Sequence, residues 1–158
     1  MHKIALTALF AIVATCQCAL AQSSSEIEGV KAANQSYYAA LSALDMTAME
    51  KVWSRGPDDT NIAPPTKPVV RQGWDAVKKA YQGYWGTLDK LTVSMDQPTI
   101  KIHGPVAWVY GIEKAQRKLK SGPEQAGINN GTSIFVNQDG HWLMVFHQAA
   151  AIPGQQSN

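Results

Sequence analysis

Residues 131–148 read GTSIFVNQDGHWLMVFHQ, and the fold follows from this stretch. Two runs rich in β-branched and aromatic residues flank Asp139-Gly140, a pair that readily adopts the positive φ angles of a tight turn. The pattern predicts a β-hairpin. A loop of two or of four residues gives the same register, in which Thr132 faces His147 and Phe135 faces Met144.

Both faces of the predicted hairpin are largely apolar. An antiparallel sheet with one face in water would instead alternate apolar and polar side chains. Helices of the same chain can easily cover only one of the two faces. The pattern therefore predicts that another surface covers the second.

The elements before the hairpin begin with helices. An apolar stripe at three- and four-residue steps predicts a helix from Glu26 to Leu44, and Asp45 can cap a short helix over Met46–Trp53. Four prolines between residues 54 and 72 allow only short edge strands there. A third helix is expected from Trp74 to about Trp85.

The rest of the chain reads as strands and turns. We expect a long strand over Val106–Lys118, a polar loop over residues 121–130, and a tail after Ile152. Helices first and antiparallel strands last indicate an α+β fold. In it, N-terminal helices pack on a strongly curved antiparallel sheet and enclose a cavity.

The first 21 residues have the form of a secretory signal peptide that is removed. Lys3 precedes an apolar stretch, and Ala19-Leu20-Ala21 forms a small-residue cleavage site. Residues 22–158 then form one domain, secreted or periplasmic. Lipoprotein anchoring at Cys16 is a second interpretation of the same segment.

The composition excludes several classes of function. Cys16 and Cys18 are the only cysteines and leave with the signal, so thiol catalysis and cysteine-bound zinc are not expected. Basic and acidic residues number 14 and 12, so the chain is nearly neutral and we expect no nucleic-acid partner. After removal of the signal we expect no membrane partner either. The histidines lack ligand spacing and the glycines lack phosphate-binding spacing, so we expect no metal and no cofactor.

Two titratable residues are candidates for catalysis. His147 could move a proton near neutral pH with Thr132 holding one ring nitrogen, or it could simply be a hydrogen-bonded histidine within the sheet. Glu113 lies mid-strand beside small residues. If its side of the strand is concave, burial would raise the pKa of the carboxyl and make it a possible base. If that side is convex, Glu113 is an edge charge or an interface residue.

Aromatic side chains on the helix stripes and on the long strand would line the cavity with rings and a few polar tips. Packing in the core is the alternative for any one of them. The expected ligand-binding set is Tyr38, Trp53, Tyr81, Trp85, Trp108, Tyr110, Thr132 and His147.

Several segments, taken in order, resemble SnoaL-like proteins of the nuclear-transport-factor-2-like superfamily, which also contains ketosteroid isomerase. They are Gly73-Trp74-Asp75-Ala76-Val77, Val106-Ala107-Trp108-Val109-Tyr110-Gly111, the strand from Gly131, and the segment from Asp139 to Ala149. The resemblance implies a cone-shaped fold with a pocket between helices and sheet. It also implies a homodimer, here through the convex sheet face. Relatives often carry a His-Pro pair where this chain has Ala63-Pro64, and more histidines around the last strand.

Three hypotheses follow from the sequence. The first is an exported module that binds a small apolar or amphipathic molecule. The second is an isomerase, cyclase or lyase that uses His147 or Glu113 for proton transfer. The third is a structural dimerisation domain whose cone is filled by aromatic side chains. The orientation of His147 and Glu113 relative to the cavity separates the first two.

Overall fold

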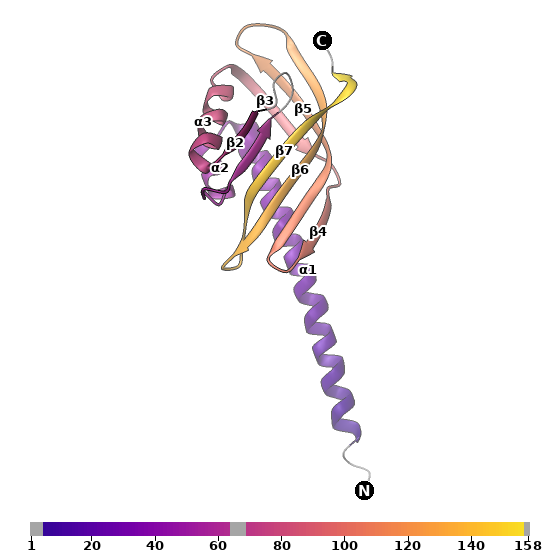
Figure 1. The fold of residues 1–158 in the computed structure, drawn as a ribbon. Coiled ribbons are helices and arrows are strands. Elements are labelled where there is room, and N and C mark those ends of the chain that lie inside the picture. The colour runs from indigo at the N-terminus through magenta and orange to yellow at the C-terminus, as the bar shows by residue number, and fades with distance from the viewer. Residues whose placement is uncertain (1–4, 64–68, 157–158) are drawn as a thin grey trace.

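The computed structural model describes the backbone of residues 5–63 and 69–156, and the side chains of residues 24–61 and 69–152. The described elements follow one another as helices and then strands, with two short strands between α2 and α3 (Figure 1). In chain order they are α1 (Ala5–Ala43), α2 (Met46–Val52), β1 (Thr60–Ala63), β2 (Val69–Gln72), α3 (Trp74–Trp85), β3 (Leu88–Met95), β4 (Thr99–His103), β5 (Val106–Leu119), β6 (Glu124–Gln138) and β7 (His141–Gln156).

The strands form one curved sheet in the order β2-β1-β7-β6-β5-β3, and β4 pairs with the other half of β5. All pairs are antiparallel except β1 with β7, which is parallel. The sheet is therefore mixed rather than purely antiparallel, and the α+β class is confirmed. The helices gather on one side of the sheet, and the N-terminal part of α1 projects beyond it (Figure 1).

The hairpin of β6 and β7 has the expected turn. Asp139 and Gly140 have φ angles of 52° and 86°, and the Asn137 side chain accepts a hydrogen bond from the Gly140 amide at 2.9 Å. The expected register holds from Gln138 opposite His141 to Phe135 opposite Met144. Beyond Phe135 it shifts by one residue, and Ser133, not Thr132, faces His147. The pairing of Thr132 with His147 was therefore wrong.

The first helix is longer than the apolar stripe predicts. It runs without a break from Ala5, so the expected start at Glu26 lies inside the helix. Cleavage after residue 21 stays a prediction. No described helix is long and apolar enough to cross a membrane.

The short elements agree closely with expectation. Asp45 caps α2, because its carboxylate accepts a hydrogen bond from the Ala48 amide at 3.0 Å. α3 ends before Gly86, as expected.

The sheet is more extensive than the polar composition of its ends suggested. β6 begins at Glu124, where we expected a loop, because Glu124 pairs with Lys118 of β5 across a tight turn. Gly122 in that turn has a φ angle of 126°, which side-chain-bearing residues rarely adopt. β7 likewise continues to Gln156 instead of ending as a tail at Ile152. Pairing with a neighbouring strand thus overrides polarity at both places.

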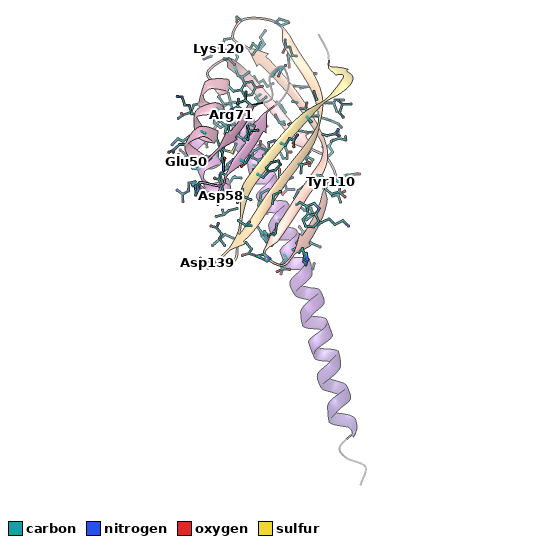
Figure 2. All side chains as sticks on the ribbon, viewed as in Figure 1. Glu50, Asp58, Arg71, Tyr110, Lys120 and Asp139 are labelled. Carbon is teal, nitrogen blue, oxygen red and sulfur yellow. The ribbon has the colours of Figure 1, made fainter. Side chains whose placement is uncertain are left out.

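The two faces of β5 differ in burial. Ala107, Val109 and Glu113 are buried on the helix side, whereas Trp108 and Tyr110 on the other side are 39% and 43% exposed. In Figure 2, Tyr110 projects from the side of the sheet away from α2 and α3. The core lies between the helices and the inner face, and the outer face is uncovered in this single chain.

Candidate functional site

The inner face of the sheet carries a row of polar side chains across four strands. The pairing places Arg71 of β2 opposite Asn61 of β1, Asn61 opposite His147 of β7, and His147 opposite Ser133 of β6. Val145 is the extra residue at the register shift, where Ile134 pairs with Phe146 and Phe135 with Met144. This β-bulge places both Met144 and His147 on the buried face.

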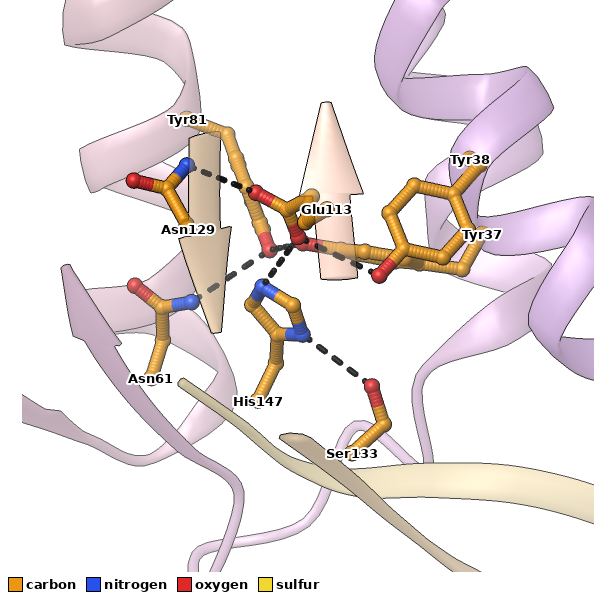
Figure 3. A network of polar contacts seen from close by, with 8 residues as sticks. All are labelled: Tyr37, Tyr38, Asn61, Tyr81, Glu113, Asn129, Ser133 and His147. Atoms are coloured by element: carbon orange, nitrogen blue, oxygen red, sulfur yellow. Dashed lines mark hydrogen bonds and ion pairs between the residues drawn. The ribbon is translucent and has the colours of Figure 1, made fainter. Parts of the chain in front are cut away.

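Glu113 reaches the same place from β5. Its Oε2 atom accepts a hydrogen bond from the Tyr38 hydroxyl at 3.1 Å, and its Oε1 atom accepts one from the Asn129 amide at 3.3 Å. His147 Nε2 lies 3.6 Å from Oε2 (Figure 3). Glu113 and His147 are each only 4% exposed. Two buried titratable groups from different strands therefore lie side by side.

A second polar cluster borders this pair. The hydroxyls of Tyr37 and Tyr81 are 3.1 Å apart, and the Asn61 amide donates to the Tyr81 hydroxyl at 3.5 Å. The Tyr37 ring lies against the His147 ring, with centroids 4.6 Å apart. When one tyrosine donates to the other, the second phenolic proton remains free for a further acceptor.

Burial dominates the electrostatics of the site. It lowers the pKa of His147 to about 3, so the ring is neutral near pH 7. Burial also raises the pKa of Glu113, although hydrogen bonds from Tyr38 and Asn129 partly oppose this. The pKa values of Tyr37, Tyr38 and Tyr81 are all raised, first by burial. The two candidate residues thus have pKa values displaced in opposite directions.

The hydrogen bonds indicate which nitrogen of His147 carries the proton. Ser133 Oγ lies 3.1 Å from Nδ1, and either atom could donate. An ionised Glu113 can only accept, so the neutral ring is best placed with its proton on Nε2 toward the carboxylate. Ser133 then donates to Nδ1. In this arrangement Ser133 fixes both the tautomer and the orientation of the ring.

A cavity of about 250 Å³ opens between α1, α3 and the inner face of the sheet. Its wall is partly apolar, but it includes both titratable candidates and two arginines. The lining residues are Tyr37, Leu41, Asn61, Arg71, Ala80, Tyr81, Tyr84, Leu91, Val93, Glu113, Ala115, Arg117, Asn129, His147 and Ala149.

Gly131 has no side chain, and the side chains of Glu113 and Met95 occupy the space beside it. A Cβ atom at Gly131 would lie 2.7 Å from Cε of Met95 and 3.3 Å from Oε2 of Glu113. The first distance is well inside van der Waals contact, so a side chain here would have to displace its neighbours. A residue without a side chain therefore lets Met95 and Glu113 pack on this part of β6.

A larger and more open groove of about 710 Å³ lies elsewhere, between α1, α2 and the hairpin turn. Small side chains such as Ala33 and Ala40 form much of its wall, and Trp142 lies at one part of it. It contains neither candidate catalytic residue. The smaller cavity is therefore the candidate site.

The structure brings together only part of the expected ligand-binding set. His147 and Tyr81 line the cavity, as does Glu113, and their roles toward a ligand stay predictions. Tyr38 is buried and holds Glu113. Trp53 and Trp85 pack against Tyr81, with ring centroids 6.4 and 5.5 Å away, and do not form the cavity wall.

Three members of the expected set lie on the opposite face, so the expectation that they line the cavity was wrong. Trp108, Tyr110 and Thr132 belong to the outer face, where Tyr110 pairs with Thr132. The alternation along each strand assigned residues to two sides but did not tell which side the helices cover.

The sequence pattern did not single out several residues of the site. Tyr37 was expected only as part of a helix stripe, and Asn61 and Arg71 lay in a segment interpreted as edge strands. Ser133 was placed on the other face because the bulge was not foreseen. Asn129 fell in the expected loop. Polar residues at inward positions of apolar strands were the available signal.

Among the side chains that the structure describes, no group of three or more His, Cys, Asp or Glu residues could hold a metal ion. The candidate site consists of one carboxyl, one imidazole, three phenols, two amides and one serine hydroxyl (Figure 3). These groups are suited to hydrogen bonding and to proton transfer.

The fold is shared by solved structures at low sequence identity. A nuclear-transport-factor-2-like protein of Salmonella enterica matches with a TM-score of 0.75 and 17% identity, over 82% of this chain and 92% of that one. A proposed dehydratase of the NTF2-like family from Streptomyces avermitilis matches with a TM-score of 0.74 and 17% identity, over 83% of this chain and 99% of that one. A proposed scytalone dehydratase from Novosphingobium aromaticivorans matches with a TM-score of 0.72 and 15% identity, over 82% of this chain and 86% of that one. Comparison with curated proteins gives no significant match.

The curved sheet, the helices on its inner face and the polar cavity between them define an α+β domain of the nuclear-transport-factor-2-like type. Residues 30–153 match the SnoaL-like domain family, and the chain belongs to that family. This fold is compatible with ligand binding and with isomerase or dehydratase activity.

Proposed function

We propose that this protein is an enzyme that binds a small, largely apolar molecule in the 250 Å³ cavity and moves a proton on it, as isomerases and dehydratases do. One observation carries the proposal. Glu113 and His147 lie 3.6 Å apart in the cavity wall, buried and with pKa values displaced in opposite directions. Pairs of titratable groups whose environments separate their pKa values are typical of acid–base sites.

Glu113 is the general base of this proposal. Burial raises the pKa of its carboxyl above the usual value of a glutamate, which makes the ionised form a stronger base. The hydrogen bonds from Tyr38 and Asn129 hold the carboxylate in one orientation. Negative charge that develops on the substrate would be met by the free phenolic proton of the Tyr37–Tyr81 pair.

His147 positions Glu113, because its protonated Nε2 atom faces the carboxylate. At 3.6 Å its Nε2 atom is slightly beyond hydrogen-bond distance from Oε2, and such contacts often tighten when a substrate is bound. Its ring stays neutral near pH 7, so it supplies no fixed positive charge beside the base.

The proposal is tested with a general probe of proton abstraction, 5-nitrobenzisoxazole. A base that takes the proton from C3 leaves the C–H electrons to form a nitrile while the N–O bond breaks to a phenolate, whose absorbance reports the rate. We expect Glu113→Gln to lower the rate at least about 100-fold, the scale of general base catalysis. Exposed Glu124→Gln is the matched control and should not change it. Equal rates for the wild type and Glu113→Gln would exclude Glu113 as a base.

A non-catalytic binding module is the second candidate. One observation favours it: both carboxylate oxygens of Glu113 already accept hydrogen bonds within the protein. In this case Glu113 and His147 would shape the cavity and orient a ligand without reacting. The probe reaction separates the two candidates, because a binding module would show no Glu113-dependent rate.

The assembly and location of the protein are part of the proposal. We infer a homodimer through the outer face of the sheet, supported by the exposed Trp108, Tyr110 and Ile112 on β5. We also infer export, with cleavage after Ala21, supported by the apolar stretch and the small residues that follow it.

A further inference from the structure

Arg71 is the one strongly basic side chain in the polar row of the inner face. It pairs with Asn61 across β1 and β2, and Asn61 pairs with His147 across β1 and β7. Neighbouring strands lie about 4.8 Å apart, so the backbone of Arg71 lies roughly 10 Å from that of His147, two strands away along the same row. Figure 2 shows Arg71 on the side of the sheet where α3 lies.

One terminal nitrogen of the Arg71 guanidinium, Nη1, is buried and makes no hydrogen bond to the residues that the structure describes. Burial raises the pKa of the nearby Tyr81 hydroxyl and the positive charge of Arg71 acts to lower it, but no ion pair of Arg71 is found among those residues. An arginine cannot lose its charge in a protein, and a buried donor without an acceptor is costly. The second arginine of the cavity differs, because Arg117 already donates from Nε to Gln125 at 2.9 Å.

The other residues of the cavity wall indicate which kind of ligand could bind to the Arg71 guanidinium. Among the cavity-wall residues that the structure describes, Glu113 alone is acidic, and it forms no ion pair with Arg71. Leu41, Leu91 and Val93 supply an apolar surface between the polar groups. A ligand that satisfies this wall has one anionic end and an apolar body.

We propose that the cavity binds a small monocarboxylate, whose carboxylate is held by Arg71 while its body extends toward Glu113 and His147. A planar guanidinium matches a carboxylate through two parallel hydrogen bonds. A doubly charged phosphate would be disfavoured because the Glu113 carboxylate lies in the same small cavity. This inference rests on the proposed function for the identity of the site and adds the class of ligand.

The test compares matched acids and amides of the same shape: benzoate with benzamide, phenylacetate with phenylacetamide, and cinnamate with cinnamamide. Binding to the full chain is measured by isothermal titration calorimetry. We expect at least one acid to bind about 10- to 100-fold more tightly than its amide, the range of a charge-assisted hydrogen bond. Equal or absent binding of acid and amide throughout the panel would overturn the proposal.

Variants locate the anion site. Arg71→Gln should abolish the preference for the acid, and Arg71→Lys should keep part of it, because the charge remains but the planar fork is lost. Arg117→Gln makes the same charge change in the same cavity and should retain the preference. Loss of the preference in Arg117→Gln but not in Arg71→Gln would overturn the assignment to Arg71. Circular dichroism checks that each variant is folded.

This result is independent of catalysis. Glu113→Gln should still prefer the acid, since it leaves Arg71 unchanged. A Glu113-dependent rate on 5-nitrobenzisoxazole without any preference for acids would refute only the carboxylate site. A preference for acids without a Glu113-dependent rate would refute only the proposed proton transfer.

Discussion

Ser133 Oγ lies 3.1 Å from Nδ1 of His147, because the β-bulge at Val145 places the two residues opposite each other on the buried face. The contact joins neighbouring strands and fixes the histidine ring. It exists only because the register of the hairpin changes partway along β6 and β7.

Replacing this serine should disturb the histidine specifically. We expect Ser133→Ala to cost about 1 kcal/mol of stability and to shift the ring nitrogen resonances of His147, because the hydrogen bond to Nδ1 is lost. Thr132→Ala is the matched control, since Thr132 lies on the outer face, and it should leave these resonances unchanged. Nitrogen-15 NMR of the imidazole measures both. A larger change in Thr132→Ala would contradict the register.

Glu113 should make the stability of the protein depend on pH. Its pKa is raised on folding, so the folded state keeps a proton at pH values where the unfolded state has lost it. Stability from this group is therefore full below about pH 4.5 and is lost as pH rises through the folded pKa. The loss is about 1.4 kcal/mol for each pH unit that separates the folded pKa from the unfolded one.

Glu113→Gln removes that loss. We expect the variant to gain stability relative to the wild type as pH rises above about 4.5 and through the folded pKa of Glu113, measured by urea unfolding. Glu124→Gln, which changes an exposed carboxylate, should show no such gain. A variant that becomes less stable than the wild type as pH rises would show that the pKa of Glu113 is lowered instead.

Gly131 should be intolerant of a side chain. We expect Gly131→Ala to cost about 1–3 kcal/mol, because the new methyl group would lie 2.7 Å from Met95 Cε. Met95→Ala in the same chain should recover part of the loss, so the two changes should be non-additive in thermal unfolding. Gly83→Ala is the contrast: apart from the neighbouring backbone of α3, no atom lies within 4 Å of its added Cβ, and it should stabilise the protein by about 0.5–1 kcal/mol.

The outer face of the sheet should mediate dimerisation. We expect the wild type to sediment as a dimer and Trp108→Glu to shift it toward monomer, because a charge would enter a desolvated apolar interface. Ile27→Glu changes a comparably exposed residue on α1, 43% against 39% for Trp108, and should leave the dimer intact. Analytical ultracentrifugation distinguishes these results, and a monomeric wild type would refute the interface.

Much of the fold could be predicted because it depends on local signals. The Asp139-Gly140 turn and the cap at Asp45 occur as expected, and so do two short strands in the proline-rich segment. The prediction that both are edge strands was wrong, because β1 lies between β2 and β7. The loop expected around Asn129 is instead strand, because pairing with β5 satisfies its backbone regardless of its polarity. Residue alternation likewise separated Glu113 from Trp108, but it could not say which of them faces the helices.

The sequence by itself determined the order of helices and strands, the hairpin turn and the two sides of β5, because these follow from backbone preferences and from side-chain periodicity over a few residues. Only the tertiary structure decided that Glu113, His147 and Arg71 line one cavity and that Ser133 contacts His147. These contacts depend on a one-residue bulge and on strand pairings between distant segments. A shift of one residue in the pairing turns a side chain to the other face of the sheet, so local sequence patterns could not predict them.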